Sequence, residues 1–418
     1  MSGLLQAAFD FPRHPLARED GERVRGAWYA PPARWLRAHR AEDLRAVIDA
    51  AHQASRDGAW VLGGLRYEAA SAFEPAMAGH ASALPLAEFA VYEQAPGPWP
   101  ELPDNAESAL TADWLDGQSD ADETAQIERV REYIRAGDCY QVNLTTRLHS
   151  ELKADDPATL FLALHRHQPG GFSLFLREAQ VTSVSPELFF DWRPLPDTQR
   201  TWLLAAQPMK GTAARGRDKV ADEAAQAYLR TSIKERAENL MIVDLLRNDI
   251  GRVAKTGSVR VPRLFELHAL PTVWQMTSTV TSISRPRLAL SEVFAALFPC
   301  GSVTGAPKIR AMQIIQELEP SARGWYCGAL GLLQPGGVAT FNVPIRTVEG
   351  EGGQGLRCGI GSAITLDSEP AAEVAEWRAK TRFLLRAQAP IAALETLRLQ
   401  GGAFVRLDGH LARLQRTA

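Results

Sequence analysis

The chain has 418 residues, of which 45% are hydrophobic and 23% charged, an ordinary composition for a globular protein with a large core. Its formal net charge of −3 gives no indication of a nucleic acid or an anionic membrane as partner. The four cysteines are widely spaced and form no C-x-x-C pair, so neither a zinc site nor a disulfide framework is predicted and a reducing cytoplasm is expected. No stretch approaches the roughly 18 apolar residues of a membrane span, and no signal peptide is predicted at the start.

The N-terminal third is predicted to combine short strands with one helix. Apolar runs at 59–65 and 87–95 predict strands, and the periodicity of 41–58 predicts a helix. The polar, acid-rich stretch 104–122 predicts a loop or boundary. We therefore expect an N-terminal subdomain over 1–120, a catalytic domain over 121–388 and a separate C-terminal extension over 389–418.

The region 121–388 is predicted to alternate helices with strands that form hairpins. Helices are expected at 121–137 and 156–169, and strands at 140–152 and around a turn in 172–194. Further along, the patterns predict one long helical segment at 219–250, a helix, glycine-rich loop and helix at 291–320, and a hairpin at 328–348. A strand from 356 leads to a helix start at Asp367 or Ser368, with Pro370 in its first turn. This organisation indicates an α+β fold with antiparallel sheets.

Lys210 is the first candidate functional residue. It stands in PMKGTAARG (208–216), where Pro208 restricts the backbone and Gly211 lets a ligand approach closely. We expect this lysine on a shaped turn, where a closed pocket would favour the neutral, nucleophilic amine. Taken alone, a lysine in such a position is more often a surface residue after a strand, and it is the surrounding motifs that favour a functional role.

Two pairs of glutamates are candidate metal ligands. Glu235 and Glu238 are three residues apart, as are Glu373 and Glu376, and this spacing puts each pair on one face of a helix. A divalent cation between two such helices would offset the repulsion within each pair, and oxygen ligands suit Mg²⁺. Each pair alone is also consistent with a solvated helix face.

Glycine-rich turns and one arginine complete a candidate anion site. The runs GSVTGAPK (301–308) and CGIGSAIT (358–365) would offer main-chain N–H groups to carboxylates. Neither has the spacing of a P-loop or of a dinucleotide-binding turn. Arg346, in a strand, would pair with a substrate carboxylate or with a protein acid. With Glu187 in SPELFF (185–190) as candidate acid, these motifs predict a site for a small polyanion.

In this combination the chain resembles the chorismate-utilising enzymes, strongly over roughly 120–388 and more weakly before it. The resemblance rests on motifs that recur in the expected order: GDCYQVNLT, SPELFF, PMKGT, ERAENLMIVDLLRNDIGRV, GSVTGAPKIRAMQIIQELEP and IRTV. It implies an α/β sandwich with two large antiparallel sheets, outer helices and an active site between the sheets.

The resemblance also implies a role for each candidate residue. It implies that Glu238 and Glu376 bind Mg²⁺, that Glu235 and Glu373 support them through water, and that Glu187 assists loss of the 4-hydroxyl of chorismate. The positions where relatives contact the substrate are Gly211, Thr212, Tyr326, Arg346, Gly359 and Gly361.

Two positions indicate the branch of the family. Anthranilate synthases carry alanine in place of Lys210, and isochorismate and salicylate synthases carry a base lysine in place of Gln141. The chain is therefore most similar to the aminodeoxychorismate synthases, in which the lysine attacks C2 of chorismate and ammonia then adds at C4. The resemblance implies that ammonia comes from a separate glutamine amidotransferase subunit, for 4-aminobenzoate and folate synthesis. Where several relatives have histidine this chain has Gln275, so no histidine role is transferred.

The tail at 389–418 resembles the opening of a class IV aminotransferase, the group that contains aminodeoxychorismate lyase, or is an irregular amphipathic extension. Three alternatives remain for the whole chain. The first is an anthranilate synthase large subunit with an atypical lysine, and the second is an aminotransferase in which Lys210 carries pyridoxal phosphate. The third is a chorismate-binding scaffold without activity.

Overall fold

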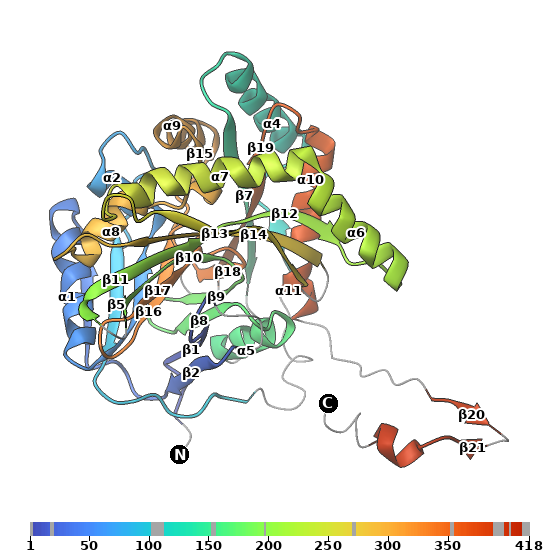
Figure 1. The fold of residues 1–418 in the computed structure, drawn as a ribbon, viewed down its shortest axis with the longest axis horizontal. Coiled ribbons are helices and arrows are strands. Elements are labelled where there is room, and N and C mark those ends of the chain that lie inside the picture. The colour runs from blue at the N-terminus through green and yellow to red at the C-terminus, as the bar shows by residue number, and fades with distance from the viewer. Residues whose placement is uncertain are drawn as a thin grey trace.

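The computed structural model of the chain (Figure 1) describes residues 3–16, 21–101, 113–151, 156–195, 198–269, 273–351, 355–387, 397–400 and 403–411. Two large antiparallel sheets face each other within these residues, and helices cover their outer sides. The fold class is therefore α+β with two antiparallel sheets, as predicted. No helix in the described part of the chain is long and apolar enough to cross a membrane.

The first sheet has nine strands. Its hydrogen-bonded order is β15-β7-β19-β18-β9-β8-β1-β2, with β6 pairing with β7 beside this path. The strands are β1 (Ala7–Pro12), β2 (Arg23–Trp28), β6 (Leu115–Asp116), β7 (Gln141–Glu151), β8 (Phe172–Leu176), β9 (Val181–Ser185), β15 (Gly305–Ala306), β18 (Thr347–Gly350) and β19 (Gly355–Ile364).

The second sheet has ten strands. Its order is β12-β14-β11-β10-β17-β16-β4-β5-β3, with β13 pairing with β14. The strands are β3 (Arg34–Ala38), β4 (Trp60–Leu65), β5 (Ala87–Tyr92), β10 (Leu188–Leu195), β11 (Thr198–Gln207), β12 (Met209–Ala214), β13 (Arg260–Ala269), β14 (Val273–Ile283), β16 (Ala329–Leu333) and β17 (Ala339–Asn342). Strands of the N-terminal third thus enter both sheets, and the domain limits at 120 and 388 stay predictions.

The helices lie between and beside these strands in the chain. They are α1 (Leu44–Arg56), α2 (Ala70–Phe73), α4 (Asp120–Arg135), α5 (Pro157–His167), α6 (Lys219–Thr231), α7 (Ile233–Gly251), α8 (Leu290–Leu297), α9 (Lys308–Leu318), α10 (Pro370–Lys380) and α11 (Arg382–Arg386). Short 3-10 helices are η1 (Ala41–Asp43), η2 (Tyr67–Ala69) and η3 (Gly301–Val303). Near the C-terminus β20 (Leu399–Gln400) and β21 (Ala403–Phe404) form a separate two-stranded sheet.

Four apolar cores hold the layers together, and the smallest of them joins α5 to β1, β2 and β8 of the nine-stranded sheet. The core between the sheets contains Phe9 and Phe11 of β1 together with Leu62 of β4 and Leu330 of β16. A second core joins the outer face of the ten-stranded sheet to α1, α7 and α8, and a third joins the nine-stranded sheet to α4, α9 and α10. Alternating strand residues account for this arrangement, because each strand sends successive side chains to opposite faces of its sheet.

Two of the places where the chain crosses between the sheets are neighbours in space. One crossover, at 186–187, joins β9 of the first sheet to β10 of the second, and the other, at 343–346, joins β17 of the second sheet to β18 of the first. Main-chain hydrogen bonds link the two crossovers: Val343 N donates to Glu187 O at 3.1 Å and Val184 N donates to Arg346 O at 3.2 Å. Both crossovers carry residues that the sequence singles out.

Some predicted elements differ from the structure. The segment 219–250 is two helices, because Ser232 has an extended ψ of 115° and its Oγ caps α7 by accepting from Glu235 N. The predicted hairpin ends after β17, and the residues from Thr347 onward join the other sheet. Helix α10 begins at Pro370 with Glu369 as N-cap, whereas Asp367 or Ser368 was expected. All four cysteines are buried and free.

Candidate active site

Lys210 lies in β12, at a bulge where the pairing with β14 shifts register. Gly211 follows with a φ of 101°, a conformation that favours glycine. The Lys210 carbonyl accepts from Asn239 Nδ2 of α7 at 3.0 Å. Its side chain is 17% exposed and places Nζ 3.7 Å from Glu238 Oε2. The lysine therefore occupies a strand bulge against α7, where the sequence predicted a turn.

Glu187 lies in the first crossover with a buried side chain. Its Oε1 accepts from Ser302 Oγ at 2.7 Å, and the carboxylate also accepts the main-chain N–H of Met209, the residue before Lys210. Burial raises the pKa of Glu187 to about 7, against the opposing effects of these hydrogen bonds and of the Lys210 charge. A carboxyl group with this pKa can hold and release a proton near neutral pH, as a general acid must.

Arg346 lies in the second crossover with a φ of 50°. Its Nη1 donates to Oε1 of Gln168, which is the residue after α5. Burial lowers the pKa of this guanidinium to about 10, and no acid among the described residues forms an ion pair with it. Of the two partners that the sequence allowed, the protein acid does not occur among the described residues, and the role of Arg346 stays a prediction.

Tyr326 and Gly359 pack directly on each other. A Cβ at Gly359 would lie 2.2 Å from Tyr326 Cδ1, so the ring occupies the space that any larger residue in β19 would fill. A Cβ at Gly361 would lie 2.3 Å from Leu144 O of the neighbouring strand β7. Both glycines therefore serve close packing. No hydrogen bond or ion pair in the described parts joins Tyr326 or either glycine to Lys210.

The four candidate glutamates lie on two helices: Glu235 and Glu238 on α7, and Glu373 and Glu376 on α10. Burial, and after it the like charge of Glu238, raises the pKa of Glu235. Partial desolvation opposes ionisation of Glu376, but the positive charges of Lys380 and Lys210 outweigh it and lower the pKa. Because Lys210 acts on Glu235 as well as on Glu376, α7 and α10 present their carboxylates to the same lysine.

The fit of these carboxylates to a metal ion can be judged from their partners. Lys380 Nζ lies 2.8 Å from Glu376 Oε1, and Ser362 Oγ donates to Glu373 Oε2 at 2.5 Å. No three His, Cys, Asp or Glu side chains within the described ranges converge as a metal-binding group. The donor set is nevertheless entirely of carboxylates, which is the chemistry that Mg²⁺ prefers.

Gln275, at a position where several relatives have histidine, contacts the residues beside Lys210. It is 8% exposed. Its Nε2 donates to Gly211 O at 3.1 Å, and its Oε1 accepts from Thr212 Oγ1 at 3.0 Å. The side chain therefore fixes the two residues that follow Lys210. Gln141 is fully buried, and both of its amide atoms lack a hydrogen-bond partner within the described residues.

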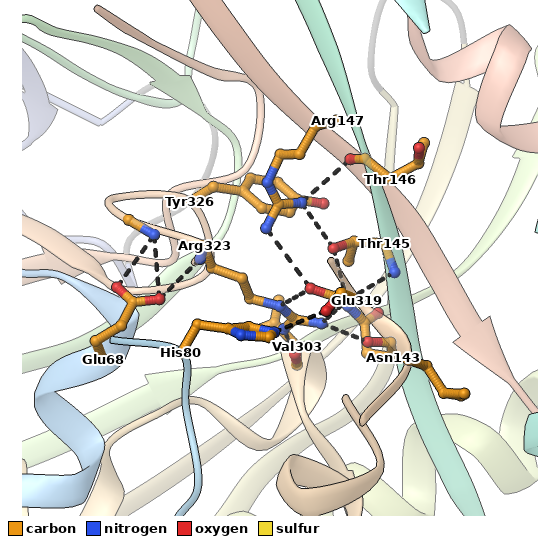
Figure 2. A network of polar contacts seen from close by, with 12 residues as sticks. Glu68, His80, Asn143, Thr145, Thr146, Arg147, Val303, Glu319, Arg323 and Tyr326 are labelled. Atoms are coloured by element: carbon orange, nitrogen blue, oxygen red, sulfur yellow. Dashed lines mark hydrogen bonds and ion pairs between the residues drawn. The ribbon is translucent and has the colours of Figure 1, made fainter. Parts of the chain in front are cut away.

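A buried ionic network supports Tyr326 and was not predicted (Figure 2). Glu319 Oε1 accepts from Thr145 N at 3.0 Å and from Arg323 Nη2 at 2.5 Å. Arg147 Nη1 donates to Thr145 Oγ1 at 2.8 Å, and its guanidinium lies 5.2 Å from the centre of the Tyr326 ring. The network joins β7, the end of α9 and the segment that carries Tyr326. The sequence signal that could have predicted this network is the presence of charged residues inside otherwise apolar segments, because a buried charge needs a partner.

Comparison with known proteins relates this geometry to a family. Residues 100–386 match the model of the chorismate binding enzymes. Aminodeoxychorismate synthase component 1 of Escherichia coli K12 is 42% identical over 279 residues, which are 66% of this chain and 60% of that protein. Anthranilate synthase component 1 of Streptomyces coelicolor is 39% identical over 281 residues, 66% of this chain and 53% of the other. The chain spans about 60% of the length of the synthase components that it matches.

Solved structures show the same fold at lower identity. Anthranilate synthase component I from Streptococcus pneumoniae superposes with a TM-score of 0.70 at 22% identity, covering 92% of this chain and 93% of that one. The menaquinone-specific isochorismate synthase of Escherichia coli superposes with a TM-score of 0.69 at 16% identity, covering 93% and 90%. This fold gives no support to the alternative of an aminotransferase. From its sequence match and its architecture together, the chain belongs to the family of chorismate binding enzymes.

Proposed function

We propose that this chain aminates chorismate at C4 to give 4-amino-4-deoxychorismate. The observation that carries the proposal is the proximity of a candidate acid to a candidate nucleophile: Glu187 accepts the main-chain N–H of Met209, the residue before Lys210, and the Lys210 charge acts on its carboxyl group. Similarity to aminodeoxychorismate synthase components supports it. The lysine in place of the alanine expected of an anthranilate synthase favours amination at C4 over amination at C2.

The two residues would divide one displacement into two easier ones. Lys210 Nζ, as the neutral amine, bonds to C2 of chorismate, the ring double bond shifts, and the 4-hydroxyl leaves as water with the proton of Glu187. Ammonia then bonds to C4, the double bond shifts back, and the C2–N bond breaks so that the lysine leaves as an amine. The new ammonium group returns one proton to the Glu187 carboxylate. The net change exchanges a hydroxyl group and ammonia for an amino group and water.

Substrate binding would use the remaining candidates. Arg346, which lacks an acidic partner among the described residues, would hold a carboxylate of chorismate. Tyr326, Gly359 and Gly361 would shape the wall on the first sheet. On the second sheet, Gly211 and Thr212 would contact the substrate beside the nucleophile, in the position that Gln275 fixes.

Mg²⁺ would be held by Glu238 of α7 and Glu376 of α10, supported by Glu235 and Glu373. When bound, the ion would neutralise these carboxylates and hold a carboxylate of chorismate electrostatically. In the structure lysines interact with Glu238 and Glu376. A glutamine amidotransferase subunit would supply ammonia, and a cytoplasmic location is part of the same proposal.

Product chromatography tests the function directly. The purified chain with chorismate, Mg²⁺ and an ammonium salt should form 4-amino-4-deoxychorismate, and glutamine should replace ammonium only when an amidotransferase is added. Anthranilate as the main product would refute amination at C4. Absence of turnover with free ammonia would favour the binding scaffold without activity.

Intact-protein mass spectrometry tests the nucleophile. The wild-type chain incubated with chorismate and Mg²⁺ without ammonia should show a covalent adduct, and Lys210→Ala should show none. Lys255→Ala, which removes an exposed lysine, is the matched control and should keep the adduct. Equal adducts on the wild type and Lys210→Ala would exclude this lysine.

A further inference from the structure

The carboxyl group of Glu187 has a second layer of support from buried polar side chains. Ser302, in η3, donates to Glu187 Oε1 at 2.7 Å. Behind it, Cys300 Sγ lies 3.2 Å from the same Ser302 Oγ, and either atom of that pair can be the donor. Glu187, Ser302 and Cys300 are 4%, 7% and 1% exposed, so water does not compete freely for these bonds.

The supports of Glu187 differ in what they can do when the carboxyl changes its charge. The Met209 N–H can only donate, so it favours the carboxylate. A hydroxyl group rotates and can donate or accept, and a thiol is a weak donor and a weak acceptor. Beside a carboxylate, the proton order can be thiol to Ser302 to Glu187. Beside a carboxylic acid, Glu187 can donate to Ser302, and Ser302 to the Cys300 sulfur.

We propose that Ser302, backed by Cys300, is a positioning residue that keeps Glu187 in one place while its carboxyl group loses and regains a proton. The inference rests on the proposed function, in which Glu187 gives its proton to the leaving hydroxyl and recovers one from the incoming ammonia. A rigid donor in place of Ser302 would oppose the protonated state. An apolar residue would leave the carboxylate without one of its donors.

The titratable groups near Glu187 cannot donate to its carboxylate and accept from its carboxylic acid as Ser302 can. Among the described residues, Lys210 on β12 supplies the positive charge that acts on the carboxyl, and Cys300 is the other titratable group against it. Burial raises the pKa of the Cys300 thiol to about 12, so the thiol keeps its proton at neutral pH and remains able to donate. The loop therefore adds polar support without adding a charge.

Infrared titration of the carboxyl group tests the inference without any substrate. The carboxylic-acid band that is present in the wild type and absent from Glu187→Gln reports the protonation of Glu187 between pH 5 and pH 9. Ser302→Ala should raise the midpoint by about one pH unit or more, because the bond that Ser302 donates to the charged carboxylate is stronger than the bond that it accepts from the neutral acid. Cys300→Ser, which keeps a donor and acceptor behind Ser302, should stay near the wild type.

Steady-state kinetics with ammonia give the second measurement. In Ser302→Ala, kcat should fall by about tenfold or more with a nearly unchanged KM for chorismate, and its decline at high pH should move upward. Ser291→Ala is the matched control: this serine is also buried and bonds to a carboxylate, that of Asp49, on the outer side of the second sheet. It should change neither the infrared midpoint nor the pH profile.

The outcomes separate the inference from the proposed function. A midpoint in Ser302→Ala equal to that of the Ser291→Ala control would overturn the inference, whatever the activity. A raised midpoint in a protein that makes no 4-amino-4-deoxychorismate would overturn the proposed function and leave the support of Glu187 established. If Ser302→Ala does not fold, Ser302→Cys keeps the side-chain size with a weaker donor and should raise the midpoint by less; an unchanged midpoint there would also overturn the inference.

Discussion

Replacing Glu187 by glutamine should make the protein more stable at alkaline pH while it removes the proposed acid. The carboxyl is buried, and its pKa is raised to about 7 from an ordinary value of 4.5. A raised folded-state pKa means that the folded chain holds the proton more tightly than the unfolded chain. Stability from this group is therefore fully present below pH 4.5 and is lost as pH rises through 7. Glutamine has a similar shape and does not titrate.

The size of the effect follows from these two pKa values. Because the unfolded chain loses this proton more easily, the titration of Glu187 lowers the free energy of unfolding by about 1 kcal/mol at pH 5.5 and by about 3 kcal/mol at pH 8.5, at 1.36 kcal/mol for each pKa unit. The stability of Glu187→Gln relative to the wild type should therefore increase by about 2 kcal/mol between these pH values. Any hydrogen bond lost from Ser302 or Met209 is a constant offset, and it cancels in the comparison.

Urea denaturation followed by intrinsic tryptophan fluorescence at pH 5.5, 7.0 and 8.5 measures this difference. Asp222→Asn is the control, because the hydrogen bond from Arg215 lowers the pKa of Asp222 to about 2. Its contribution is complete above pH 4, so the stability of this variant relative to the wild type should not change over the same range. A Glu187→Gln difference that is also independent of pH would refute the raised pKa and with it the assignment of Glu187 as acid.

Three further predictions concern the other parts of the site. Glu376→Gln should weaken the apparent affinity for Mg²⁺ by at least about tenfold in activity titrations, with an unchanged circular dichroism spectrum; wild-type affinity would remove Glu376 from the metal site. Arg346→Gln should raise the KM for chorismate by about tenfold to a hundredfold, as expected for loss of a charged hydrogen bond. A fall in kcat with an unchanged KM would contradict a binding role. Gly359→Ala should lower the free energy of unfolding by about 1–3 kcal/mol, because the new Cβ displaces the Tyr326 ring; thermal denaturation showing no change would mean that the ring moves freely.

The sequence predicted local structure where the signal is local. Ser119 and Asp122 form a capping box at the start of α4, and the apolar spacing of that helix places Ile127 and Val130 in the core. The break at Ser232 was missed because the helical pattern continues through it, although Ser232 and Glu235 have the spacing of a capping box; the hydrogen bond from Glu235 N to the serine hydroxyl forms the cap.

Predictions of the site reached the residue types but not their partners. The spacing of each glutamate pair was readable, since three residues along a helix return to one face. The bond between Arg346 and Gln168 spans 178 positions, and that between Ser302 and Glu187 spans 115. Such pairs depend on strand order in two sheets, and a single sequence contains no local pattern that specifies strand order.

The two crossovers should keep the distance between Glu187 and Arg346 nearly constant when the two sheets move relative to each other. Glu187 and Arg346 each lie where the chain leaves one sheet for the other, and Val343 and Val184 bond these two segments directly. If the far edges of the sandwich spread apart, the segments act as a common hinge, and the residues on it turn together. Lys210 lies on an edge strand of the second sheet, but the hydrogen bond from Met209 N to the Glu187 carboxylate ties that strand to the same hinge. Spreading of the far edges would thus leave the spacing of Lys210, Glu187 and Arg346 nearly unchanged.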